Sequence, residues 1–161
     1  MGLRGYGKVH LATPYGGCTT VRSVAPNATV VLPDVTTPTA VGLPLSLEIA
    51  RGPLRIAGSS HLTAKVTTLL PDSRAFLGLA IGRSPLDAQL VQDNVMPLDQ
   101  PTSLLRVARR IELPGSTVDV PAHQRFFLLV TPVSDTFAAM GSRVPRAVRL
   151  EDVRVHLPVV R

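Results

Sequence analysis

Ser84 is the residue of this 161-residue chain whose surroundings come nearest to a hydrolase nucleophile motif. Such a serine occupies a strained strand-to-helix turn with the pattern G-x-S-x-G, which exposes its hydroxyl beside an oxyanion hole. Residues 82–86, Gly-Arg-Ser-Pro-Leu, supply the first glycine and the serine but not the second glycine. Pro85 is typical of the first position of a helix, with Ser84 as its N-cap. The sequence therefore favours a capping role for Ser84 over a catalytic one.

The histidines and the single cysteine do not follow a metal-binding pattern. None of the four histidines has a His or Cys partner at the spacing of a local zinc site. On an alternating strand, His61 and His156 face solvent. Cys18 would act as a nucleophile only beside a positive group that favours its thiolate, so a structural or incidental thiol is the favoured interpretation. We predict no catalytic residue, no metal and no cofactor in this chain. The histidines are His10, His61, His123 and His156.

Four aspartates lie near predicted loops, where carboxylates can ligate calcium. Each also fits an ordinary turn or cap, and the sequence has no D-x-D-x-D-G series. Whether a loop binds calcium or sugar is therefore left open. Asn27-Ala28-Thr29 matches a glycosylation sequon, which matters only in a eukaryotic secretory setting. The aspartates are Asp72, Asp87, Asp93 and Asp99.

Arginine dominates the charge of the chain, with 15 Arg against 2 Lys, 11 acidic residues and a net charge of +6. A basic surface can attract nucleic acid. Single-strand binders, however, combine such a surface with stacking aromatic side chains. This chain has 4 Phe, 2 Tyr and no Trp, and none lies near the arginine clusters. We therefore interpret the arginines as solvated strand faces, and nucleic-acid binding is disfavoured. The clusters are Arg106, Arg109 and Arg110, and Arg143, Arg146, Arg149 and Arg154.

The apolar runs of the chain are too short to cross a membrane. The longest, such as Phe126–Val130, has about five residues, against the roughly 20 that a spanning helix needs. The first residues do not read as a secretory signal, because Pro14 and a Gly-Gly pair interrupt the apolar stretch. One cysteine fits a reducing compartment. The sequence thus slightly favours the cytoplasm and leaves secretion open.

Frequent proline and glycine, 15 and 12 residues, leave little room for helices of ordinary length. Between these residues lie short alternating or β-branched runs, which predict strands. One short helix is predicted over Ser84–Gln92. The sequence predicts an all-β fold, an antiparallel β-sandwich or jelly roll with at most one or two short helices. The expected strands are Ala28–Val35, Leu45–Ala50, Leu54–Ala57, His61–Leu69, Ala75–Ile81, Leu104–Leu113, Thr117–Val120, Phe126–Val130 and Val148–Val160.

Four stretches carry a family resemblance. Two of them combine apolar strands with a Gly-Pro or Pro-Asp turn, the third places a His just before an apolar strand, and the fourth is a terminal strand. From Leu43 to its end, the chain resembles the C-terminal non-catalytic domain of the Xaa-Pro dipeptidyl-peptidase and cocaine-esterase-like hydrolases. It departs from that pattern at His123, which lacks the usual preceding Gly and is followed by an extra Gln124. The stretches are Leu43–Gly58, His61–Leu77, Pro121–Val130 and Val153–Val160.

The resemblance implies a galactose-binding-like jelly roll over residues 43–161. Residues 1–42 do not match the family, and we predict them as an N-terminal segment that adds edge strands to the same domain. In complete family members this domain packs on an α/β-hydrolase domain, which carries the catalytic Ser, Asp and His. No catalytic role is implied for any residue here. The chain would then be a piece of a larger hydrolase and inert when isolated.

Three functions follow as hypotheses. The first is a non-catalytic β-sandwich domain of a serine hydrolase that acts on peptides or esters, with the α/β-hydrolase domain as its partner. The second is a free-standing carbohydrate-binding jelly roll, although sugar platforms need exposed aromatics and Tyr6 and Tyr15 lie outside the matching region. The third is a structural module that assembles into a homo-oligomer.

Overall fold

The computed structural model describes residues 5–10, 20–24, 28–36, 44–68, 74–99, 105–134, 136–137 and 148–160. All regular structure in these ranges is β-strand, and the strands pair antiparallel. The short turns fixed by Pro and Gly account for this result, because they leave segments of strand length between them. The strands are β1 (Gly5–His10), β2 (Thr20–Val24), β3 (Ala28–Val31), β4 (Val35–Thr36), β5 (Leu45–Arg51), β6 (Leu54–Gly58), β7 (His61–Thr68), β8 (Arg74–Gly82), β9 (Gln89–Asp99), β10 (Val107–Glu112), β11 (Ser116–Val120), β12 (Arg125–Thr131), β13 (Val148–Leu157) and β14 (Val159–Val160).

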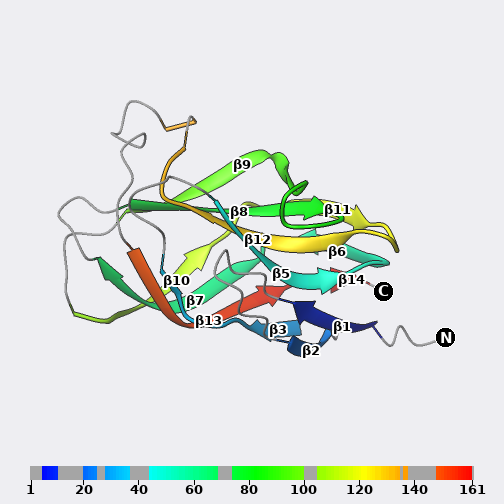
Figure 1. Cartoon of the computed structure of the whole chain (residues 1–161), viewed down its shortest axis with the longest axis horizontal. Coiled ribbons are helices and arrows are strands. Elements are labelled where there is room, and N and C mark those ends of the chain that lie inside the picture. The colour runs from blue at the N-terminus through cyan, green and yellow to red at the C-terminus, as the bar shows by residue number, and fades with distance from the viewer. Residues whose placement is uncertain are drawn as a thin grey trace.

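Two sheets form the sandwich, as Figure 1 shows. One has the strand order β10-β7-β13-β3, with β4 also on β13, and the other has the order β5-β12-β8-β9. From β3 onward the chain crosses repeatedly between these sheets, and among the described strands only the pairs β3–β4 and β8–β9 follow each other in one sheet. This order is that of a double-sheet jelly roll. The predicted all-β antiparallel sandwich of jelly-roll type is therefore confirmed. A small sheet, β11-β6-β14, lies at one end.

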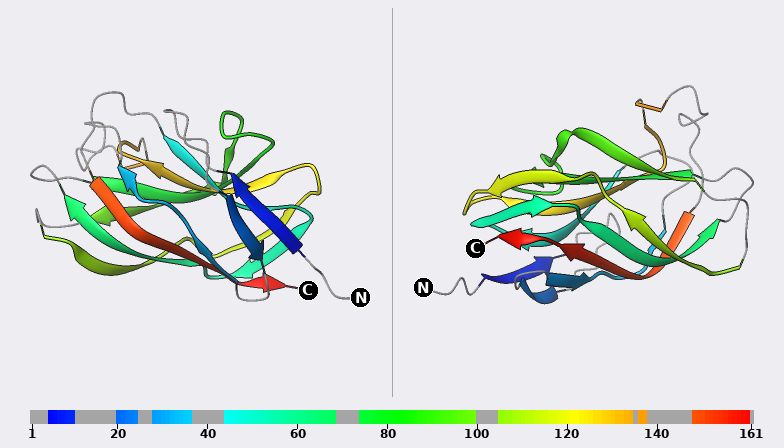
Figure 2. Two further views of the ribbon diagram at one scale, coloured as in Figure 1. Left: turned by 60° about the horizontal axis from the view of Figure 1, so that its bottom comes forward. Right: turned by 180° about the vertical axis from the view of Figure 1, so that it is seen from behind.

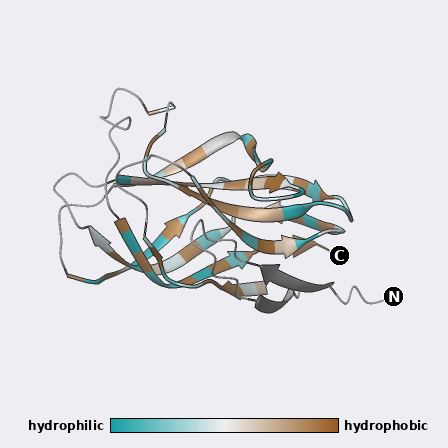
Figure 3. Ribbon diagram, viewed as in Figure 1, coloured by the Kyte–Doolittle hydropathy of each residue, from teal (hydrophilic) through white to brown (hydrophobic). Residues whose placement is uncertain are grey.

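The hydrophobic core lies between the two main sheets and takes alternate residues from each. Leu62, Ala64 and Val66 of β7 point into it, whereas His61, Thr63 and Lys65 point outward. Hydrophobic and hydrophilic residues accordingly alternate along the ribbons in Figure 3. This period of two fixes the register, because a shift by one residue would expose the apolar set. The outward side chains of β7 and of its neighbouring strands therefore lie on one face of the sheet.

The N-terminal hairpin of β1 and β2 lies at the side of the sandwich. β1 contacts β5 and β2 contacts β3, which are edge strands of different sheets. Figure 2 shows the hairpin beside these two strands. An unpaired edge exposes backbone donors and acceptors, so covering it protects the domain from pairing with other chains. The division of the chain at residue 42 remains a prediction.

The helix predicted over Ser84–Gln92 is wrong. Residues 83–88 form bends and a turn, and β9 begins at Gln89. Asp87 Oδ1 accepts hydrogen bonds from the backbone N–H of Ser84 at 2.6 Å and from its hydroxyl at 2.9 Å. Ser84 is therefore held by Asp87 and caps no helix. The turn is tight because Gly82 packs against Ala88. A Cβ added at position 82 would lie only 2.7 Å from the Ala88 Cα.

Two other predicted strands are interrupted by proline. The run Ala28–Val35 divides into β3 and β4 around Pro33, and the last run divides into β13 and β14 at Pro158. Proline lacks the N–H that a sheet ladder needs, which explains both breaks. Within Leu104–Leu113, the preferred strand assignment is correct over β10. No helix formed by the described residues is long and apolar enough to span a bilayer.

Candidate functional site

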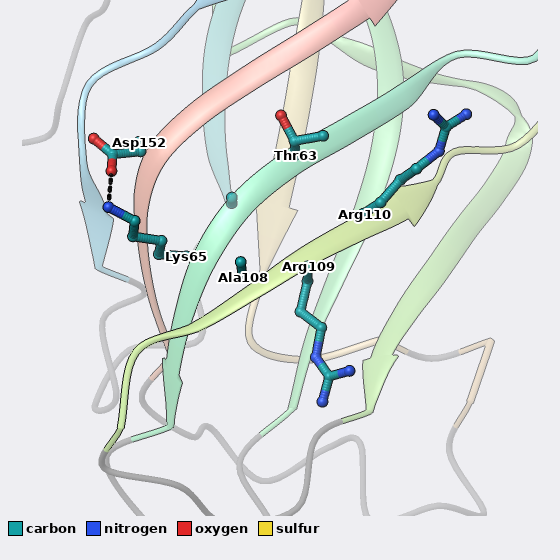
Figure 4. A pocket seen from close by; sticks show the side chains of 7 residues that line it. Thr63, Lys65, Ala108, Arg109, Arg110 and Asp152 are labelled. Carbon is teal, nitrogen blue, oxygen red and sulfur yellow. Dashed lines mark ion pairs between the residues drawn. The ribbon is translucent and has the colours of Figure 1, made fainter.

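A shallow hollow of about 360 Å³ lies on the outward face of the β10-β7-β13-β3 sheet. Small side chains, Thr63 and Ala108 among them, form its floor, and charged side chains surround it. Figure 4 shows Arg110 and Arg109 leaving β10 in different directions, with Lys65 and Asp152 on the opposite side. The full lining is Thr63, Ala64, Lys65, Ala108, Arg109, Arg110 and Asp152.

Strand register explains why these residues meet. Thr63 is paired with Arg110 of β10 on one side and with Arg154 of β13 on the other. The two arginines therefore flank one threonine across three strands. Neighbouring strands are about 4.8 Å apart, so their Cα atoms lie roughly 10 Å from each other. Long guanidinium side chains can converge over such a distance.

A β-bulge in β13 supplies the acidic side of the hollow. The register shifts between Glu151 and Arg154, and Asp152 has a φ of 52°, a conformation that Asp tolerates better than most residues. The Asp152 N–H donates to Asp34 Oδ1 at 3.2 Å, which fixes the bulge. Asp152 Oδ2 then lies 2.6 Å from Lys65 Nζ. The ammonium of Lys65 lowers the pKa of Asp152, so this carboxylate is ionised at neutral pH.

Two further acids on this face are also paired with arginines. Glu112 Oε1 lies 2.7 Å from Arg110 Nε, and this hydrogen bond lowers the pKa of Glu112. Glu151 is buried and forms two ion pairs. Its Oε2 lies 3.0 Å from Arg106 Nε, and its Oε1 lies 3.2 Å from Arg149 Nη2. The exposed guanidinium of Arg154 has no ion-pair partner within the described part of the chain. Positive charge therefore exceeds negative charge on this face.

The next row on the same face contains two histidines that are 95 residues apart in sequence. His156 of β13 is paired with His61 of β7, and their rings stack with centroids 4.3 Å apart and an interplanar angle of 12°. Thr29 Oγ1 lies 2.8 Å from His156 Nδ1, and Glu112 is paired with His61 on the other side. Partial burial lowers the pKa of His156, and His61 with the two flanking arginines lowers it further.

This histidine pair was not predicted. The sequence places both rings on outward faces, and the structure agrees. The sequence gives no sign, however, that β7 and β13 are neighbours. Only the strand order of a jelly roll, together with the register, brings the two positions together. The pair also differs from a metal site, since no group of three or more His, Cys, Asp or Glu residues gathers among the described positions.

A second charged cluster lies on the outward face of the other sheet. Glu48 of β5 is only 1% exposed, and its two oxygens bind Arg51 Nε at 2.6 Å and Arg125 at 2.9 Å. Register places Arg51, Arg125 and Gly82 in one row at the end of this sheet. The cluster therefore links the ends of β5 and β12 and neutralises a buried carboxylate.

The other candidate residues are dispersed. Ser84 and Asp87 bind each other in the turn between β8 and β9, and the Ser84 hydroxyl donates to Asp87. His123 is exposed in the turn between β11 and β12. The remaining candidates lie outside the described residues or side chains: His10, Cys18, Asn27, Asp72, Asp93, Asp99, Arg143 and Arg146.

Solved structures share the fold of almost the whole chain. Two crystal structures of a CocE/NonD family hydrolase from Staphylococcus aureus match 99% of it, with TM-scores of 0.54 and 0.57 and sequence identities of 12% and 13%. The chain spans 37% of the length of that hydrolase. A CBM22-1 xylan-binding domain of Paenibacillus barcinonensis Xyn10C matches 95% of the chain and 81% of its own length, with 14% identity and a TM-score of 0.38.

Sequence comparison adds no relative. No protein-family model and no curated protein matches the sequence. The hydrolase likeness therefore establishes a fold: this chain is built like one part of a CocE/NonD family hydrolase. The match to the xylan-binding domain is too weak to support a function.

Proposed function

We propose that this chain is the non-catalytic β-sandwich domain of a serine hydrolase of the Xaa-Pro dipeptidyl-peptidase or cocaine-esterase type. In this proposal it packs on an α/β-hydrolase domain and shapes the entrance to the active site. The observation that carries the proposal is the coverage, 99% of this chain against 37% of the matched hydrolase. The rest of a protein of that size has room for a catalytic domain.

The surroundings of Ser84 also support a non-catalytic role. A serine nucleophile needs a histidine within hydrogen-bond distance to take its proton. The hydroxyl of Ser84 instead donates to Asp87, in a turn that has no second glycine after the serine. Asp87 has a lowered pKa because it accepts the Ser84 backbone N–H and hydroxyl. An ionised Asp87 that is held in this way fixes the turn.

One end of the sandwich has the features of a docking surface. Leu86 lies in the turn that Asp87 fixes and is 99% exposed. At the same end, a groove of about 370 Å³ is lined mainly by apolar residues of β6, β11 and β14 and their turns. An exposed leucine at the same end of a domain as an apolar groove is typical of a protein interface. The lining residues are Pro53, Leu54, Arg55, Asp119, Val120, Pro121 and Val160.

Two measurements test the proposal. The coding frame upstream of Met1 is expected to encode an α/β-hydrolase domain with a G-x-S-x-G motif, and a stop codon directly before Met1 contradicts this. The purified chain is expected not to hydrolyse p-nitrophenyl esters or Xaa-Pro p-nitroanilides. Turnover that a serine-directed fluorophosphonate blocks, with the label on this chain, would overturn the non-catalytic assignment.

A further inference from the structure

The outward face of the β10-β7-β13-β3 sheet gathers more positive than negative charge. The acids Glu112, Glu151 and Asp152 of this face are each already bound to at least one basic side chain, and Asp34, which accepts the Asp152 N–H, adds a further carboxylate beside them. Arg154 remains as an exposed guanidinium without an ion-pair partner among the described residues. The positive groups on the face are Lys65, Arg106, Arg110, Arg149 and Arg154, with His61 and His156 in the adjacent row.

The arrangement around Thr63 suits an anion better than a cation. Arg154 and Arg110 lie on its two sides, and His61 precedes it by two residues on the same face of β7. Guanidinium groups bind oxyanions through paired N–H donors, and a threonine hydroxyl adds a neutral donor. A transition metal would prefer the histidine nitrogens, but it would be repelled by the same two arginines.

Positively charged groups surround the stacked histidine pair and affect the pKa of His156. The charged groups that face the stacked pair are Arg110 and Glu112 from β10 and Arg154 from β13, while β3 contributes the neutral Thr29. Burial lowers the pKa of His156 most, and His61 and the two arginines lower it further. A bound anion would offset that repulsion, so anion binding and histidine protonation favour each other through linkage.

We propose that the surface over Thr63, between Arg154 and Arg110 and beside the hollow, binds an oxyanion of the phosphate or sulfate class, and binds it more tightly when His156 is protonated. The half-buried Thr63 and the exposed Ala108 line the hollow and leave room for such a group above the sheet. This site lies on a different sheet from Glu48 and is independent of the proposed hydrolase partner.

Calorimetric and NMR titrations of the whole chain with inorganic phosphate, sulfate and tripolyphosphate test the site. They are made at about pH 5.5 and about pH 7.5, on either side of the ordinary histidine pKa of about 6.5. Saturable sulfate binding that is several-fold tighter at the lower pH is expected, because sulfate keeps its charge over this interval, whereas phosphate becomes protonated. A sugar phosphate monoester, run in parallel, distinguishes a free anion from one carried on a larger molecule.

Two variants and a control locate the site. Arg154→Gln is expected to weaken phosphate binding about tenfold, as for one charge-assisted hydrogen bond. His156→Gln is expected to reduce the pH dependence. Arg55→Gln makes the same charge change on β6, where Arg55 is paired with the exposed Asp119 at 3.4 Å, and should leave binding unchanged.

Three outcomes would overturn the proposal. One is the absence of saturable phosphate or sulfate binding at either pH. Another is an equal loss of affinity in Arg154→Gln and Arg55→Gln, which indicates general attraction by net charge. The third is binding to a single-stranded oligonucleotide without any response to the small anions, which indicates a different class of ligand.

Discussion

The buried carboxylate of Glu48 lies 2.9 Å from the guanidinium of Arg125, a residue 77 positions later in the sequence. Arg51, at the end of the same strand as Glu48, binds the other carboxylate oxygen. A buried charge is tolerated only when its oxygens are compensated, and here both are. This contact joins β5 to β12 at the end of the sheet where the Leu86 turn lies.

Replacing Glu48 is therefore expected to destabilise the domain. Glu48→Gln leaves two guanidinium groups facing a neutral amide, and a loss of about 2 kcal/mol in the free energy of unfolding is expected, since the partly exposed arginines remain hydrated. Urea denaturation measures this loss. The matched control is Glu112→Gln, which breaks an exposed pair with Arg110 and should change stability little. Equal effects of the two changes would contradict the role assigned to Glu48.

The turn between β5 and β6 gives a second prediction. A Cβ at Gly52 would lie 1.9 Å from the carbonyl oxygen of Pro121, so Gly52→Ala must displace backbone. It also threatens the hydrogen bond from Gly52 N–H to the Gln124 carbonyl, 3.0 Å long. A fall in stability of about 2 kcal/mol or more is expected from thermal or urea unfolding. Gly115→Ala is the control, because its Cβ would meet Ser59 Oγ at an ordinary 3.5 Å. An unchanged midpoint for Gly52→Ala argues against this packing.

Acid should destabilise the domain through His156. Its pKa is lowered in the folded state, so the folded chain binds this proton less readily than the unfolded chain does. The contribution of His156 to stability is present above the unfolded pKa of about 6.5 and is lost as pH falls through the folded pKa. The free energy of unfolding should thus decrease between about pH 7.5 and about pH 5.5.

His156→Gln is the variant that tests this dependence. Its stability curve should be flatter than that of the unchanged chain over the same pH interval. Asp87, Glu112 and Asp152 also have lowered pKa values, and their contributions are lost at more acidic pH, as it falls through their folded pKa values. A curve that is equally steep in the variant assigns the effect to other groups.

The Asp87 turn predicts a local change in hydrogen exchange. In Asp87→Ala the Ser84 amide loses its acceptor, so its exchange should accelerate while the core strands keep their protection. Ser84→Ala is the control: it removes the hydroxyl contact but keeps the shorter bond from the Ser84 amide to Asp87. NMR exchange rates of the amides in residues 82–90 measure both. Unchanged exchange at position 84 in Asp87→Ala contradicts the turn geometry.

The sequence predicts the parts of this fold that depend on local pattern. The alternation in β5 and β7 and the Pro and Gly turns identify strands, because each depends on residues close in the chain. The helix over 84–92 fails because pairing of β9 with β8 outweighs the local capping signal. Local pattern does not contain the strand order. The stacking of His61 on His156 and the ion pair of the buried Glu48 with Arg125 both depend on that order.

Leu86 gives the prediction that bears on function. Its side chain is 99% exposed, so Leu86→Ser should leave the stability of this chain unchanged within about 0.5 kcal/mol. In the hydrolase polypeptide that we propose, the same change removes an apolar anchor and should weaken packing of the β-sandwich on the catalytic domain. Limited proteolysis and ester turnover of that polypeptide measure the effect, with Arg83→Ser in the same turn as the control. A polypeptide in which Leu86→Ser and Arg83→Ser behave alike would place the docking surface elsewhere.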